Sequence, residues 1–152
     1  MDSIDYADSH CHLNYPGLVE IQDDVITRMH KNNIKYALNV CTKLEEFDEI
    51  YETVSRHDFL YASVGIHPDT TKNIEATVKK LCEIGDKKKV VAIGETGLDY
   101  FRKEGENLDW QRKRFRIHIR AARELKKPLI IHMRDATEDT LTILKEEKAY
   151  IY

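Results

Sequence analysis

Short apolar runs rich in β-branched and aromatic residues alternate along the chain with longer segments of helical periodicity. The apolar runs predict five strands, over residues 4–13, 35–41, 60–67, 90–95 and 128–132. The segments between them predict five helices, over residues 20–31, 44–56, 73–84, 108–126 and 137–147. The third helix shows the period most clearly, with Ile74, Val78, Leu81 and Cys82 on one face. Five strand–helix units in series are typical of a parallel sheet with crossover helices.

A parallel sheet of this kind either stays open or closes into a (β/α) barrel, whose eight units occupy ~250 residues. No G-x-G-x-x-G motif follows the first strand and the chain has no P-loop, so nucleotide-binding open sheets lose their main support. Residues 149–152 resemble the start of a sixth strand. We therefore expect an α/β fold, a TIM-like (β/α) barrel represented by about five or six units. Residues 1–152 would then form the N-terminal part of one barrel domain.

Composition narrows the class of protein. Of the 152 residues, 41% are hydrophobic and 34% are charged, which fits a globular protein and argues against wholesale disorder. No apolar run approaches the ~18–20 residues that a bilayer span requires, and the acidic N-terminus does not resemble a secretory signal. Cys11, Cys41 and Cys82 are widely spaced, which favours reduced thiols in a cytoplasmic protein. The net charge of −3 argues against bulk electrostatic binding of nucleic acid, so function must depend on a specific site.

Histidine and glutamate recur where the predicted strands end. His10 and His12 are two positions apart, so on a strand their side chains project to the same side, ~6.6 Å apart. Glu95 ends the fourth strand between glycines that permit close approach, and His132 ends the fifth. The carboxyl ends of the strands of a parallel barrel surround one mouth, so we expect these four residues to converge on metal ions. Taken singly, each also fits a polar strand cap or an exposed loop acid.

Two more residues near these strand ends are candidates for contacting substrate. His67 follows the third apolar run, before a proline, and could contact substrate or metal. Arg134 could donate two hydrogen bonds to a phosphate, or it could form a structural ion pair with Asp135 or Glu95. We take Glu95, His67 and Arg134 as the catalytic candidates.

The fourth predicted helix carries two features for which we favour a structural interpretation. His118 lies in its apolar stripe and is expected to be a buried, hydrogen-bonded histidine. Residues 102–127 carry ten Lys and Arg residues against four acids, which fits either a phosphate-binding surface or an ordinary solvated face. We favour the solvated face because the outer helices of a barrel lie far from its mouth. The arginines on one ~80° arc of the helix are Arg112, Arg116, Arg120 and Arg123.

The chain resembles the TatD family of metal-dependent hydrolases, which includes deoxyribonucleases. The resemblance extends over essentially the whole chain, in order and spacing. It rests on D-S-H-C-H-L at 8–13, V-G-I-H-P at 64–68, G-E-T-G-L-D-Y at 94–100, Q-x-x-x-F-x-x-H at 111–118 and P-L-I-I-H-M-R-D-A at 128–136. A rival phosphoesterase family that also begins with H-x-H, the PHP type, lacks the G-E-T-G-L-D segment.

The resemblance implies a distorted barrel that holds two divalent metal ions (Zn, Mg or Mn). His10 and His12 would bind the first ion, Glu95 would bridge the two, and His132 would bind the second. The family completes its site with a histidine at the end of strand 6 and an aspartate at the end of strand 8. Both positions would follow residue 152, so we expect the chain to be the N-terminal portion of such an enzyme.

The activity implied is hydrolysis of phosphodiester bonds in DNA by a metal-activated water, as a 3′–5′ exonuclease acting on single strands or 3′ ends. Two other functions stay open. One is hydrolysis of a small ester, amide or phosphodiester. The other is a non-catalytic half-barrel that self-associates through its unpaired strand edges.

Overall fold

The computed structural model describes residues 4–71 and 74–149, which form one five-stranded parallel sheet in the order β1-β2-β3-β4-β5. The strands are β1 (Tyr6–Cys11), β2 (Ile34–Asn39), β3 (Leu60–Val64), β4 (Val90–Asp99) and β5 (Leu129–Arg134). The helices are α1 (Gln22–Lys31), α2 (Phe47–Arg56), α3 (Val78–Gly85), α4 (Asp109–Leu125) and α5 (Thr137–Glu146). Short 3-10 turns, η1 (Val19–Ile21) and η2 (Leu44–Glu46), precede α1 and α2.

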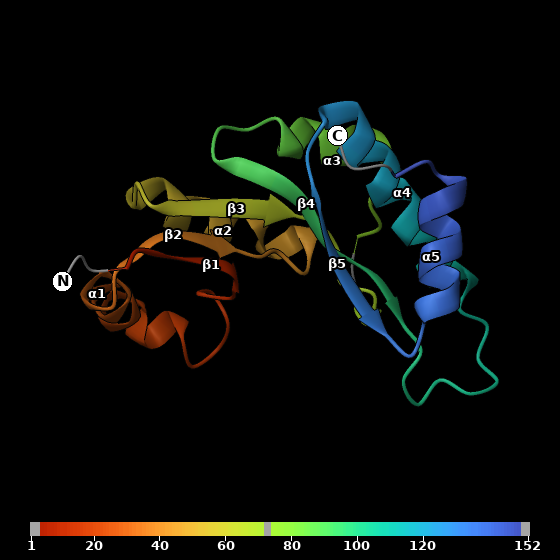
Figure 1. Cartoon of the computed structure of the whole chain (residues 1–152), viewed down its shortest axis with the longest axis horizontal. Coiled ribbons are helices and arrows are strands. Elements are labelled where there is room, and N and C mark those ends of the chain that lie inside the picture. Colours follow the sequence, from red (N-terminus) through yellow and green to blue (C-terminus); the bar gives the residue numbers. More distant parts are fainter. Residues whose placement is uncertain (1–3, 72–73, 150–152) are drawn as a thin grey trace.

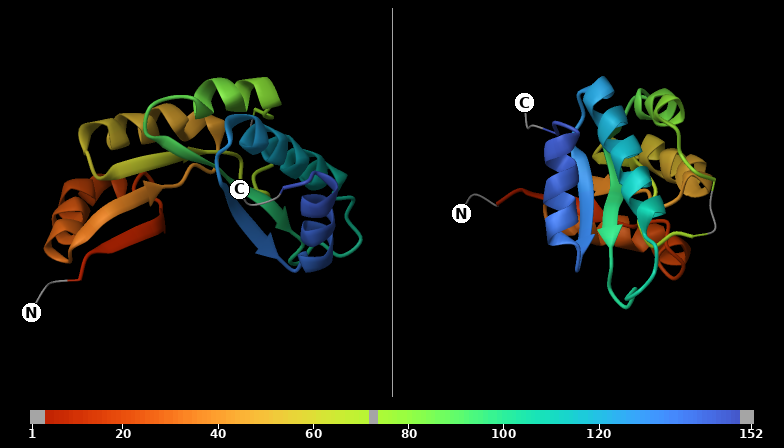
Figure 2. Two further views of the ribbon diagram at one scale, coloured as in Figure 1. Left: turned by 45° about the horizontal axis from the view of Figure 1, so that its top comes forward. Right: turned by 90° about the vertical axis from the view of Figure 1, so that its right-hand side faces the viewer.

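The sheet curls strongly, and the helices pack along its outer, convex side (Figures 1 and 2). All four strand pairs are parallel and join neighbours in sequence, which leaves β1 and β5 as the two edges. This is the arrangement of a partly closed (β/α) barrel, so the predicted fold class is confirmed. No helix in the described part of the chain has the length and apolar character needed to cross a membrane.

Apolar side chains between the sheet and the helices form two core clusters. The larger lies under α2 and α3 and includes the fully buried Leu60, Ile66 and Leu81. The smaller joins the distal half of β4 to α4 and α5, through residues such as Leu98 and Phe115. Burial of each such side chain contributes roughly 1.5–3 kcal/mol to folding, so the two clusters hold the sheet in its curled shape.

The observed elements differ from the predicted ones in three places. β4 runs past Glu95 to Asp99, because residues 96–99 continue to pair with residues 131–134 of β5. The third helix begins only after Thr77, whose side chain accepts a hydrogen bond from the backbone N–H of Lys80. Ile74 is therefore outside the helix and 67% exposed, and its predicted place on one helix face with Val78 and Leu81 is wrong. Of the predicted sixth strand, residues 150–152 lie outside the described residues, and Ala149 is not in a strand.

Glycines allow β3, β4 and β5 to approach closely beneath the strand ends. A Cβ atom on Gly65 would lie 2.5 Å from the carbonyl carbon of Gly94. Gly97 has φ 137°, and a Cβ atom there would lie 2.0 Å from the carbonyl oxygen of His132. Only glycine fits such contacts, and they bring the residues around Glu95 close to the neighbouring strands.

His118 joins α4 to the segment that follows β3. Its Nδ1 donates to the carbonyl of Arg114 at 2.8 Å, and its Nε2 accepts from the N–H of Ile66 at 3.0 Å. Burial lowers the pKa of His118 to about 4, so the ring is neutral at neutral pH. The predicted buried structural histidine is confirmed, and it anchors the backbone one residue before His67.

The basic face of α4 is neutralised where it meets the end of α5. Arg116 forms ion pairs with Glu146 and Glu147, and Arg120 pairs with Glu147 at 2.7 Å. Arg123 donates to the backbone oxygen of Glu147 at 2.8 Å. The face thus includes a helix–helix contact, and Arg120 and Arg123 on it are exposed, in keeping with the solvated face that we favoured.

Candidate metal centre

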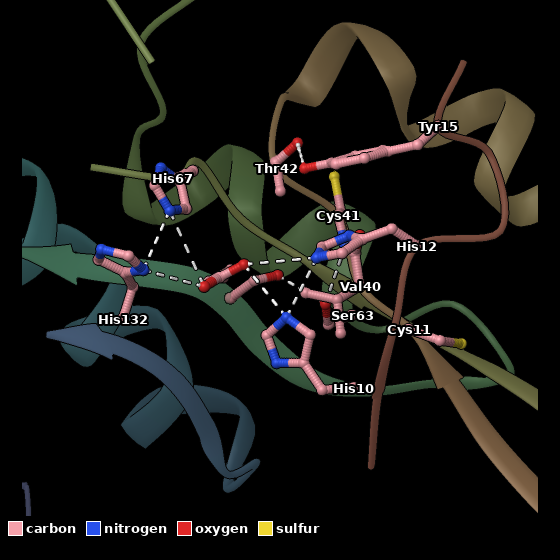
Figure 3. Close-up of polar contacts among 12 residues, drawn as sticks. His10, Cys11, His12, Tyr15, Val40, Cys41, Thr42, Ser63, His67 and His132 are labelled. Carbon is pink, nitrogen blue, oxygen red and sulfur yellow. Dashed lines mark hydrogen bonds and ion pairs between the residues drawn. The ribbon is translucent and has the colours of Figure 1, made fainter. Parts of the chain in front are cut away.

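The side chain of Glu95 lies between two pairs of imidazoles at one end of the sheet. Its Oε2 is 3.3 Å from Nε2 of His10 and 3.8 Å from Nε2 of His12. Its Oε1 is 3.3 Å from Nδ1 of His132 and 3.9 Å from Nε2 of His67. Figure 3 shows the two histidine pairs on opposite sides of the site. The structure therefore brings His10, His12, Glu95 and His132 together, and it adds His67 to the second pair.

In the first group of possible ligands, which is His10, His12 and Glu95, His12 is oriented for binding a cation through Nε2. Its Nδ1 donates to the carbonyl of Val40 at 3.0 Å, which leaves the lone pair of the neutral ring on Nε2. The ring stacks on Tyr15 with centroids 4.4 Å apart. Burial lowers the pKa of His12 and so favours the neutral form that binds metals. The Nε2 atoms of His10 and His12 lie 3.2 Å apart, aimed at one point.

In the second group, His132 is oriented by a carboxylate. Its Nε2 donates to Oδ2 of Asp99 at 2.9 Å, which leaves the Nδ1 lone pair directed toward Glu95. Gln111 of α4 holds the backbone of Asp99 through two hydrogen bonds, of 2.8 and 3.0 Å. A carboxylate behind a ligating histidine fixes the tautomer and increases its basicity. The sequence interpretation assigned no role to Asp99, although its place four residues after Glu95 in the G-E-T-G-L-D-Y segment was a usable signal.

His67 differs from His12 and His132, because it presents a protonated ring nitrogen to the site instead of a lone pair. Its Nδ1 accepts from the backbone N–H of Asp69 at 3.1 Å, so the proton of the neutral ring lies on Nε2. That Nε2 is 3.1 Å from Nδ1 of His132. Burial and the neighbouring His132 lower the pKa of His67, so this ring is neutral as well. The group His67, Glu95 and His132 is close enough to share a cation, but the hydrogen bonds make His67 a donor toward the site.

The peptide unit between Gly94 and Glu95 is tied to β3 and to the segment that follows β2. The N–H of Glu95 donates to the carbonyl of Cys41 at 2.8 Å. Ser63 donates through its hydroxyl to the carbonyl of Gly94 at 2.6 Å and accepts from the N–H of Cys41 at 3.2 Å. Glu95 is only 8% exposed, so it is not the exposed loop acid that the sequence left as an alternative.

The donor set fits divalent cations. A buried carboxylate is costly unless a positive charge compensates it. The carboxylate of Glu95 takes part in two groups of three residues whose ligand atoms lie within 4.8 Å of one another. Imidazole and carboxylate together suit ions such as Zn²⁺ or Mn²⁺.

The cysteines nearby are not suited to bind metal or to act as nucleophiles. Cys11 points away from the histidines (Figure 3) and donates to the carbonyl of Leu38 at 3.3 Å. Burial raises the pKa of both Cys11 and Cys41 to about 12, so their thiols stay protonated.

Arg134 lies at the end of β5, two residues after His132. Its guanidinium lies 3.6 Å from the centroid of the Phe101 ring. Neither Glu95 nor Asp135 forms an ion pair with it, so the predicted ion-pair alternative is wrong. The arginine keeps its charge available at the mouth of the half-barrel.

A surface cleft of about 560 Å³ opens beside the histidines. Its lining includes His67 together with Tyr15, Thr42 and Thr70, and this volume is large enough for a small ligand or one nucleotide unit. Another cleft, of about 700 Å³, lies between α1 and α2, and five of its eleven lining residues are acidic. This second cleft contains none of the candidate site residues, so the 560 Å³ cleft beside His67 is the better candidate for binding substrate.

Comparison with known proteins identifies relatives of the whole chain. The family described as TatD related DNase matches residues 7–151. The uncharacterized metal-dependent hydrolase YcfH of Escherichia coli is 40% identical over 145 residues, which cover 93% of this chain and 54% of YcfH. The 3′-5′ ssDNA/RNA exonuclease TatD of Escherichia fergusonii is 31% identical over 125 residues, covering 82% of this chain and 48% of that enzyme.

A solved structure shows the same fold. The crystal structure of YJJV, a TatD homolog from Escherichia coli, superimposes with a TM-score of 0.84 at 24% identity. The match covers 95% of this chain and 56% of that one. The chain thus spans about half the length of the curated relatives it matches.

Proposed function

The chain belongs to the family of TatD-related DNases, and from this premise we propose that it is part of a metal-dependent phosphodiesterase acting on DNA. The observation that carries the proposal is the position of Glu95, with one carboxylate oxygen toward His10 and His12 and the other toward His132. A carboxylate shared in this way is suited to bridge two cations. We take the four residues as the metal ligands.

Each residue has a distinct task in this proposal. Two bound cations would supply an activated water and neutralise charge on the phosphate oxygens. His67 would donate its Nε2 proton in a hydrogen bond to a phosphoryl oxygen, because its Nδ1 is engaged by Asp69. Arg134 would donate to a phosphate oxygen from the end of β5. Asp99 would hold His132 in the tautomer that presents Nδ1.

We propose single-stranded DNA, degraded from the 3′ end, as the substrate. The name of one relative, a 3′-5′ ssDNA/RNA exonuclease, supports this mode. The net charge of −3 also disfavours wrapping of duplex DNA. Three free thiols among the described residues are compatible with a reducing compartment, and we propose the cytoplasm.

The test is cleavage of single-stranded oligonucleotides, labelled at the 5′ or the 3′ end, with added Mg²⁺, Mn²⁺ or Zn²⁺. We expect products to shorten from the 3′ end, and we expect His10→Ala and Glu95→Ala to abolish cleavage. His30→Ala, which removes an exposed imidazole, is the matched control. Unchanged cleavage in both site variants would overturn the proposal. Turnover of a small phosphodiester or carboxylic ester, with no cleavage of DNA, would favour the small-substrate alternative.

A further inference from the structure

Within the described part of the chain, two arginines near the site differ from the others in having neither a carboxylate nor a backbone carbonyl as a side-chain partner. Within the described ranges, the arginines that form ion pairs are Arg28, Arg56, Arg112, Arg114, Arg116 and Arg120. Arg102, Arg123 and Arg134 form none. Arg123 donates to the backbone oxygen of Glu147 instead, whereas Arg102 and Arg134 lie against the ring of Phe101, at 4.8 Å and 3.6 Å from its centroid.

This contact holds the two charges in place without neutralising them. A cation over an aromatic ring is attracted by the negative face of the ring and keeps its full charge. The edges of the guanidinium group stay free to donate hydrogen bonds, and Arg102 and Arg134 are both exposed. An ion pair with a carboxylate would use those donors and cancel the charge.

Phe101 and the two arginines lie next to the histidine pair of His67 and His132. His132 and Arg134 are two positions apart on β5, so their side chains project from the same side, ~6.6 Å apart along the strand. Asp99, whose carboxylate holds His132, is the register partner of Arg134 on β4. Phe101 follows Asp99 by two residues, and its N–H donates to the carboxylate of Asp99 at 3.1 Å.

The same loop reaches the rim of the 560 Å³ cleft. Lys103, next to Arg102, lies 3.8 Å from the carboxylate of Asp69. Asp69 lines the cleft together with His67 and Thr70. The arginine pair, the histidines and the cleft therefore form one continuous surface around the end of the sheet.

We propose that Phe101, Arg102 and Arg134 form a platform that binds the phosphate backbone of single-stranded nucleic acid beside the metal centre. The proposal rests on the proposed function and specifies its substrate as a polyanion longer than one nucleotide. Phe101 acts as a positioning residue, because its ring presents both guanidinium groups to the nucleic-acid strand. A small neutral ester would make no use of this platform.

The test is the binding of a fluorescent oligothymidylate to the chain, followed by anisotropy in the presence of EDTA, so that no metal contributes. Arg102→Gln and Arg134→Gln should each weaken binding about tenfold. Each should also reduce the slope of log K against log salt by about 0.7, as expected for one lost phosphate contact. Arg56→Gln removes the same charge from an exposed, ion-paired arginine at the end of α2 and should bind like the parent chain.

Phe101 gives the more specific readout. Phe101→Leu should weaken binding although no charge is lost. Phe101→Trp keeps a cation-binding ring and should bind about as tightly as the parent chain. Circular dichroism and urea unfolding of each variant exclude loss of fold as the cause. If Phe101→Leu binds like the parent chain, the positioning role is rejected.

The remaining outcomes separate the platform from the proposed function. No binding by the parent chain, equal weakening by Arg56→Gln, or displacement of the oligonucleotide by equimolar inorganic phosphate would overturn the platform. Hydrolysis of bis(p-nitrophenyl) phosphate by the parent chain with added Mn²⁺ tests the metal centre on its own. Arginine-dependent binding without this hydrolysis would support the platform and count against the proposed function. Hydrolysis without arginine-dependent binding would support the proposed function and overturn the platform.

Discussion

Asp99 accepts a hydrogen bond from Nε2 of His132, with Oδ2 and Nε2 2.9 Å apart, and this contact determines which nitrogen His132 presents to Glu95. Asp99 is 5% exposed and belongs to β4, whereas His132 belongs to β5. The contact therefore exists only when the two strands pair in the observed register.

Replacing this carboxylate should weaken metal binding without destroying the fold. We expect Asp99→Asn to lower the affinity for Zn²⁺ or Mn²⁺ about 10–100-fold, because the group that accepts the hydrogen bond from Nε2 of His132 then carries no charge. Isothermal titration calorimetry measures the affinity, and ¹⁵N NMR of the histidine side chains reports the tautomer. Asp86→Asn, at an exposed position after α3, is the control. Equal affinities in the two variants would show that Asp99 does not act through His132.

The shared carboxylate should couple the two ion sites. We expect the parent chain to bind two divalent ions and Glu95→Gln to weaken both, because each of its oxygens faces a different histidine group. His132→Asn should weaken only one of the two ions. Titration with Mn²⁺, followed by electron paramagnetic resonance, counts the ions. A Glu95→Gln chain that still binds both with parental affinity would refute the bridging role.

Close packing at Gly65 should make this position intolerant of a methyl group. In Gly65→Ala the new Cβ would meet the backbone of Gly94 at 2.5–2.8 Å, so β3 and β4 would have to separate. We expect a loss of roughly 1–3 kcal/mol in the free energy of unfolding, measured by urea denaturation. Gly105→Ala is the comparison, because a Cβ there meets nothing within 4 Å and only the backbone preference at φ 78° opposes it. Equal losses would show that the strand approach is not tight.

Buried His118 should make the chain sensitive to acid. Its pKa is lowered from 6.5 to about 4, so between these values the unfolded chain binds the proton that the folded chain excludes. The contribution to stability is complete above pH 6.5 and is lost as the pH falls toward 4, by about 3 kcal/mol in total. Unfolding midpoints from pH 4 to 8 should therefore rise with pH, and His118→Gln should flatten the rise. An unchanged pH profile in His118→Gln, with His30→Gln as the control, would contradict this assignment.

The two edge strands should promote association. β1 and β5 each have only one neighbour among the described strands, and Met133 on β5 is 46% exposed. An open strand edge with apolar side chains favours pairing with another chain. We expect the mass measured by light scattering to rise with concentration, and Met133→Glu to reduce the rise more than Leu141→Glu on α5. A monomer at all concentrations that cleaves DNA would exclude the self-associating, non-catalytic alternative.

Local pattern was sufficient for the order of the elements and for the residues at their ends. Alternation and helical periodicity depend on neighbours in sequence, so all five strands and all five helices were predicted, most of them close to their observed bounds. The errors arose where tertiary contacts override local pattern. β4 continues past Glu95 because β5 supplies hydrogen-bond partners, and Ile74 is exposed because the helix starts only after the Thr77 cap.

What the sequence by itself determined was that histidines and a glutamate lie near the ends of four of the five strands. Because parallel strands end on one side of a sheet, it predicted that these side chains converge. Only the tertiary structure decided which oxygen of Glu95 faces which imidazole, that His67 meets His132 across 65 positions, and that Asp99 stands behind His132. These distances depend on strand register and sheet curvature. Both are set by packing between segments far apart in the chain, and no local pattern records them.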